Sequence, residues 1–143
     1  MKKTLFILII GILLCTFVGC NANRRKAEVT VDSIIELFDE DYNAQEYTSE
    51  MIAQILPNFE KNGVTINGSI SAIVHLTKKA SAPDRSDWSW AYVYEFTDEA
   101  DAIAFEENRR AFVDATEENG ACVRCGLIVV FGSAPIISSI TSD

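Results

Sequence analysis

Apolar side chains recur along residues 30–143 with a spacing that alternates between helical and strand-like. Over 31–39 they follow the i, i+3, i+4, i+7 pattern of one buried helical face, with Thr30 placed as an N-cap. The same pattern returns after Ser49 and predicts a second helix. Pro57 should end or kink that helix because proline removes an amide donor, and Asn62-Gly63 reads as the turn that follows.

A two-residue alternation then replaces the helical spacing. Residues 65–77 alternate apolar and polar side chains, which predicts a half-buried strand with His75 on its polar side. Residues 90–96 are rich in β-forming side chains, and a long helix is expected over roughly 98–118. A hairpin over 122–131 and a short terminal helix from about Ser133 complete the pattern.

This order of elements predicts an α+β fold. We expect a single antiparallel sheet of about four strands with helices packed on one face. No long linker and no internal repeat interrupts residues 30–143, so they should form one domain. The predicted division is a signal peptide at 1–19, a lipidated N-terminus and polar tether at 20–29, and the domain at 30–143.

The first twenty residues have the layout of a secretory signal. Lys2 and Lys3 precede an uncharged, mostly apolar run from Leu5 to Gly19, which is shorter than the roughly 20 residues a membrane-spanning helix needs. The Phe17-Val18-Gly19-Cys20 segment resembles the lipobox of bacterial lipoproteins, although leucine is usual where Phe17 stands. We therefore expect cleavage before Cys20 and lipidation of its thiol; an ordinary signal peptide or an uncleaved anchor is the alternative.

Two later segments carry a wider resemblance. The runs AYVYEFTDEADAIAF and GLIVVFGSAPI look like parts of small uncharacterised lipoproteins of Gram-positive bacteria. The likeness covers the lipobox and about the C-terminal third of the chain, and its motifs are structural. It implies a lipid-anchored protein on the outer face of the cell membrane and supplies no catalytic residues.

Charge narrows the range of partners. Five of the 12 Lys and Arg side chains lie in residues 1–26 and all 21 Asp and Glu side chains lie beyond them, so the chain from Ala27 onward carries −14. That excess argues against nucleic acid, which is bound through basic groups. The basic stretch at 21–26 either attracts anionic lipid headgroups or is a solvated linker. We expect the membrane and an unknown protein or small molecule as partners.

One acidic segment has the spacing of a calcium loop. Asp39, Asp41, Asn43 and Glu50 fall at positions 1, 3, 5 and 12 of an EF-hand-like window over residues 39–50. Ala44 stands where the motif wants glycine for its sharp turn. A calcium-responsive module is therefore an alternative function, and the same side chains are also ordinary in a helix–helix connector.

The remaining cysteines form a CxxC pair. Cys122 and Cys125 sit in a predicted strand entering a turn, without the helix N-terminus that would stabilise a thiolate. A structural disulfide or two unreactive thiols is the favoured interpretation, and a thiol redox protein is a weaker alternative function.

Alternating aromatic residues are the strongest binding candidates. Trp88, Trp90, Tyr92, Tyr94 and Phe96 should share one side of a strand, where they could stack sugar rings or dock a partner. The favoured interpretation is a core face with Ala91 and Val93 turned outward, and with Trp88 and Trp90 most exposed. The single histidine, His75, lacks a nucleophile motif beside it, so we expect a binding domain that is not an enzyme and needs no metal or cofactor.

Overall fold

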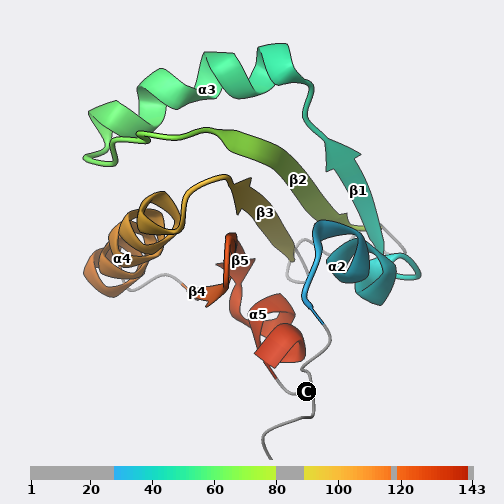
Figure 1. Cartoon of the computed structure of the whole chain (residues 1–143). Helices are drawn as coiled ribbons and strands as arrows, with labels where there is room; N and C mark the ends of the chain where they lie inside the picture. Colours follow the sequence, from blue (N-terminus) through green and yellow to red (C-terminus); the bar gives the residue numbers. More distant parts are fainter. Residues whose placement is uncertain (1–27, 80–88, 117–118, 142–143) are drawn as a thin grey trace, which may run out of the picture.

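The computed structural model describes residues 28–79, 89–116 and 119–141, which form four helices and five strands (Figure 1). The elements in chain order are α2 Val31–Phe38, β1 Tyr42–Glu46, α3 Ser49–Lys61, β2 Ile70–Lys78, β3 Trp90–Phe96, α4 Glu99–Thr116, β4 Gly120–Cys125, β5 Ile128–Ser133 and α5 Ala134–Thr141. The predicted signal peptide, the predicted lipidation site Cys20 and most of the predicted tether lie outside the described residues. Within the described part, no helix is long and apolar enough to cross a membrane.

All five strands join one sheet in the order β1-β2-β3-β5-β4, and every neighbouring pair is antiparallel. The predicted α+β class and the single antiparallel sheet are therefore confirmed. The sheet has five strands rather than about four, because β1 forms from residues predicted to connect two helices. Its sequence YNAQE is polar and almost wholly exposed, so no hydrophobic alternation marks it as a strand.

Helices cover both faces of the sheet, and the prediction that they pack on one face is wrong. Figure 1 shows α3 and α4 on one side and α2 and α5 on the other. Each side has its own core cluster: Ile52, Phe59 and Phe105 belong to the α3/α4 side, whereas Ile34 and Ile136 belong to the α2/α5 side. Two covered faces explain why Ile128–Phe131 forms an unbroken apolar run that is buried throughout.

Local signals place the start of α2 and the turn after α3 where the sequence predicts them. The Thr30 hydroxyl accepts a hydrogen bond from Ser33 N at 3.1 Å, and Ser33 Oγ accepts one from Thr30 N at 3.0 Å, so α2 starts with a capping box. Pro57 does not end α3, which continues to Lys61. Gly63 then supplies the left-handed residue of the turn, with φ +84°.

Candidate functional site

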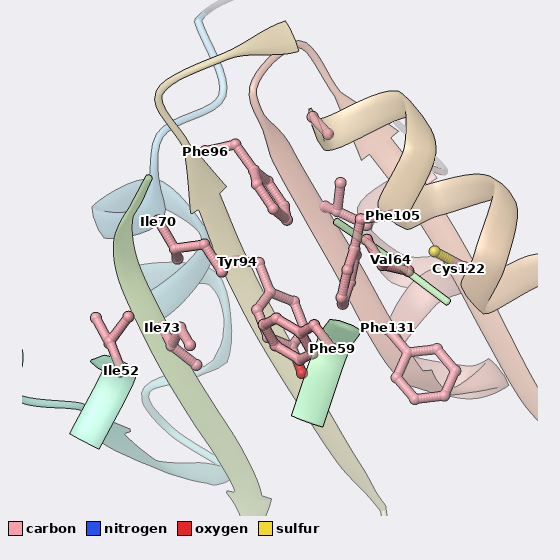
Figure 2. Close-up of a cluster of buried hydrophobic side chains, with 12 residues drawn as sticks. Ile52, Phe59, Val64, Ile70, Ile73, Tyr94, Phe96, Phe105, Cys122 and Phe131 are labelled. Carbon is pink, nitrogen blue, oxygen red and sulfur yellow. The ribbon is translucent and has the colours of Figure 1, made fainter. Parts of the chain in front are cut away.

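The aromatic side chains of β3 share the α3/α4 side of the sheet, as their alternation predicts. Tyr94 and Phe96 are buried there against Phe105 of α4, with ring centroids 4.6 Å and 5.3 Å from that residue (Figure 2). The core interpretation is thus correct for these two residues. Trp90 and Tyr92 are only half-buried, and Trp88 lies outside the described residues.

Four half-buried rings contact one another on the α3/α4 side of the sheet. We call Tyr47, His75, Trp90 and Tyr92 the aromatic patch. Tyr92 is its centre: the His75 ring stacks on it with centroids 4.2 Å apart, and Trp90 and Tyr47 meet it edge-on at 5.9 Å and 6.3 Å. Trp90 and Tyr92 lie on β3, His75 lies opposite Tyr92 on β2, and Tyr47 follows β1, so the paired strands hold the rings in a fixed arrangement.

The position of His75 differs from the prediction. The regular pairing of β2 with β3 is interrupted between Ile70 and Ala72, and this bulge puts Ile70 and Ile73 on the same face. His75 follows Ile73 by two residues and therefore joins the aromatic face, directly opposite Tyr92. It does not lie on a polar side of its strand.

The opposite side of β3 is also buried. Ala91 and Val93 have no exposed surface, because they belong to the core cluster formed with α2 and α5. The expectation that they turn outward is wrong because the second helical layer, α2 and α5, covers them. The same layer makes the prediction of helices on one face wrong. The aromatic patch is thus a partly open area on one face of a sheet whose central strands carry helices on both faces.

Burial keeps two polar groups of the patch uncharged near neutral pH, the imidazole of His75 and the phenol of Tyr92. Burial lowers the pKa of His75 from its ordinary value of 6.5. Burial and, secondarily, the hydrogen bond with Tyr47 raise the pKa of Tyr92 to about 12. The patch therefore offers apolar ring faces together with neutral imidazole and phenol groups, which suits a ligand that combines apolar surface with hydroxyl or amide groups.

A positively charged side chain lies one aromatic ring away from this patch and was not predicted from the sequence. Phe131 contacts Trp90 edge-on at 5.6 Å, and the Arg109 guanidinium lies over the Phe131 ring, with Cζ 5.7 Å from its centroid. Arg109 also donates two hydrogen bonds to Asn108 Oδ1, at 3.2 and 2.6 Å. Among the described residues no carboxylate forms an ion pair with it.

Nothing in the sequence around Arg109 marks it out. It lies among other charged residues on α4, and only the packing of α4 across β5 brings it to Phe131. The neighbouring Arg110 instead pairs with Glu106 at 2.8 Å, as their i, i+4 spacing suggests.

The acidic window at 39–50 does not form a calcium loop. Asn43 lies within β1 and pairs with Thr77 of β2, so the centre of the window is an extended strand. This strand alone spans about 16 Å, and it separates Asp39 and Asp41 from Glu50 in the first turn of α3. Calcium ligands must all lie about 2.3–2.6 Å from one ion. In the described part of the chain no group of three or more His, Cys, Asp or Glu residues is placed to hold a metal.

The two cysteines point to opposite faces of β4. Cys122 pairs with Phe131 and belongs to the α3/α4 core, whereas Cys125 pairs with Ile128 of the other core. Three residues of extended strand separate their Cα atoms by about 10 Å, beyond disulfide reach. Both thiols are free, and burial, then the nearby Glu106, raises the pKa of Cys122 to about 12. A dithiol redox pair is therefore excluded by the geometry.

Comparison of the chain with protein-family models, with curated proteins and with solved structures gives no match.

Proposed function

We propose that this protein is a lipid-anchored extracytoplasmic domain that binds a ligand or a partner protein and catalyses no reaction. The N-terminal segment supports the anchor: a short apolar run behind two lysines leads to Cys20 in a lipobox-like sequence. Two or three long acyl chains on that cysteine would hold the protein at the membrane, since each buried CH₂ contributes about 0.8 kcal/mol.

The aromatic patch is the observation that carries the binding role. Its four rings come from β2, β3 and the segment after β1, and they remain half-exposed, whereas Tyr94, Phe96 and Phe105 on the same side of the sheet are buried. Rigid aromatic side chains provide much contact area at a small cost in conformational entropy. Arg109, whose guanidinium has no carboxylate partner among the described residues, lies one ring away from the patch, over Phe131, which contacts Trp90.

The non-catalytic part of the proposal rests on the groups near the patch. Cys122 lies on the same face, but its thiol is buried and stays protonated at neutral pH because its pKa is raised to about 12. The imidazole of His75 stacks on the ring of Tyr92, which has no carboxylate that could orient the imidazole as a general base.

The anchor can be tested in cells. Bacteria that express the chain should incorporate labelled palmitate into it, and a Cys20→Ala variant should incorporate none and leave the membrane fraction. A Cys15→Ala variant is the matched control, because that cysteine lies within the expected signal peptide. Equal labelling of the wild type and the Cys20→Ala variant would contradict the proposed anchor.

The binding role needs a test at the patch itself. A photoreactive phenylalanine analogue in place of Trp90, activated in intact cells, should give a discrete adduct with the bound partner. The same analogue at Leu127, an exposed residue of the β4–β5 turn, is the control. Soluble cell-surface glycans can be titrated in parallel against the tryptophan fluorescence. Identical crosslinking at both positions, with no fluorescence response, would overturn the patch as a binding site.

A further inference from the structure

Strand β1 presents an open edge on which the sheet can be extended. It is the first strand of the sheet order, and among the described residues it pairs only with β2. Residues 43–46 are exposed, and the pairing with β2 runs without a bulge from Tyr42 to Glu46. Figure 1 shows the free side of β1 directed away from β3 and β5.

The hydrogen bonds that flank β1 identify the backbone groups on this free side. Lys79 N donates to Asp41 O, and Tyr47 N donates to Ile73 O. In an antiparallel pair, alternate residues turn both backbone groups toward the partner, so the odd-numbered residues of β1 bond with β2. The N–H and C=O groups of Tyr42, Ala44 and Glu46 therefore point outward, away from the sheet.

The other edge of the sheet is protected. Both α4 and α5 pack against β4, and the β4 side chains are half-buried or buried. Soluble proteins protect exposed edges with proline, lysine, bulges or very short strands. The described β1 has no proline, lysine or bulge, and its one charged residue is Glu46.

The charge around the β1 edge selects its partner. Residues 36–50 contain six exposed carboxylates and no lysine or arginine: Glu36, Asp39, Glu40, Asp41, Glu46 and Glu50. Two lysines lie close by: Lys78 is opposite Tyr42 on β2, and Lys79 Nζ donates to the backbone carbonyls of Asp39 and Glu40 at 2.6 and 3.1 Å. The six carboxylates outnumber these two lysines, so an incoming strand meets a surface of net negative charge.

A second copy of the chain is a poor occupant for this edge. Antiparallel pairing of two β1 strands about Ala44 would bring Asp39 and Asp41 of each copy toward Glu46 and Glu50 of the other. Like charges across a strand pair are destabilising. The same charges favour a cationic strand, and backbone hydrogen bonds make such binding tolerant of its exact sequence.

We propose that β1 binds an extended, basic peptide segment of a partner protein, which adds to the sheet as a sixth strand beside Tyr42, Ala44 and Glu46. This surface is distinct from the aromatic patch, so binding at β1 does not depend on whether the patch binds a ligand. Side chains of the added strand that face the α3/α4 side would lie next to Asn43 and Gln45.

The test uses the full chain in mild detergent and a fluorescent peptide of alternating lysine and valine. A glutamate–valine peptide and a lysine–valine peptide methylated on alternate backbone nitrogens are the controls. Fluorescence anisotropy should show binding of the unmodified lysine–valine peptide alone. An Ala44→Pro variant removes an outward N–H without touching the β1–β2 ladder, so it should weaken binding by about tenfold or more. Ala44→Ser keeps that N–H and should bind like the wild type.

Each other outcome overturns the proposal. Equal binding of the methylated peptide would show that charge alone attracts it, and unaltered affinity of the Ala44→Pro variant would remove the edge as the site. Sedimentation that shows a wild-type dimer, converted to a monomer by Ala44→Pro, would identify a second copy as the occupant. An Asp41→Asn/Glu46→Gln variant should also weaken binding. If Ala44→Pro lowers the melting temperature, this variant and the methylated peptide replace it as the test of the β1 site.

Discussion

The imidazole of His75 lies parallel to the ring of Tyr92, with the planes only 5° apart and the centroids at 4.2 Å. The two residues are opposite each other on β2 and β3, so the sheet itself sets this contact. It joins the only histidine of the chain to the centre of the aromatic patch. The protonation of one side chain therefore bears directly on the surface proposed to bind a ligand.

Protonation of His75 should destabilise the fold. Because burial lowers its pKa in the folded protein, the unfolded chain binds this proton more tightly. The contribution of His75 to stability is complete above its ordinary pKa of 6.5 and is lost as the pH falls below that value. Urea midpoints measured between about pH 7.5 and about pH 5 should therefore fall more steeply for the wild type than for His75→Gln. The carboxylates also titrate in this pH range, but they are the same in both proteins. Curves of urea midpoint against pH that run parallel for the wild type and His75→Gln would therefore contradict the prediction.

The cysteines should differ sharply in reactivity. Cys122 is buried with a pKa raised to about 12, whereas Cys125 is half-exposed near the β4–β5 turn. Under native conditions at mildly alkaline pH, a thiol reagent should modify Cys125 and leave Cys122 intact until denaturant is added. Mass spectrometry of Cys122→Ala and Cys125→Ala variants gives the assignment. Fast native labelling of the Cys125→Ala variant would show that Cys122 is accessible.

A buried carboxylate holds the segment that leads into β2. Asp101 is 1% exposed, and its carboxylate accepts hydrogen bonds from Asn67 N at 3.0 Å and Gly68 N at 2.7 Å. Asp101→Asn would direct an amide NH₂ toward these donors and should cost about 2 kcal/mol of unfolding free energy. Glu107→Gln, an exposed change on the same helix, should cost almost nothing. Chemical denaturation of both variants measures the difference, and equal stabilities would rule out this role for Asp101.

Signals confined to a few neighbouring residues made part of the fold predictable. The Thr30 cap, the helical spacing behind it and the β-rich stretch at Trp90–Phe96 need no information from distant residues. The hairpin that turns at Gly126, with φ +63°, is equally local. The class and the antiparallel sheet could therefore be predicted from the sequence.

Features that depend on distant packing could not be predicted in the same way. β1 is recognisable only through its pairing with β2, because YNAQE has no apolar side to bury. The face occupied by His75 depends on one bulge near Ser71, and a shift of one residue moves every later side chain to the other face. The buried run at Ile128–Phe131 was the one signal for a second helical layer, since a strand covered on one side should alternate.

The contact between β3 and β5 leaves no room for a side chain at Gly132. A Cβ atom there would lie 2.3 Å from the Trp90 carbonyl oxygen and 2.5 Å from Ala91 Cα, so the backbones of two central strands would have to separate. Gly132→Ala should therefore lower the unfolding free energy by about 3 kcal/mol and disturb Trp90 in the aromatic patch. Gly126→Ala is the control: its Cβ meets nothing within 4 Å, so only the positive φ of +63° opposes it, at about 1 kcal/mol. Urea unfolding followed by tryptophan fluorescence measures both variants. If Gly132→Ala proved no more destabilising than Gly126→Ala, the two strands would have to be able to move apart, and the rigid support inferred for the patch would be lost.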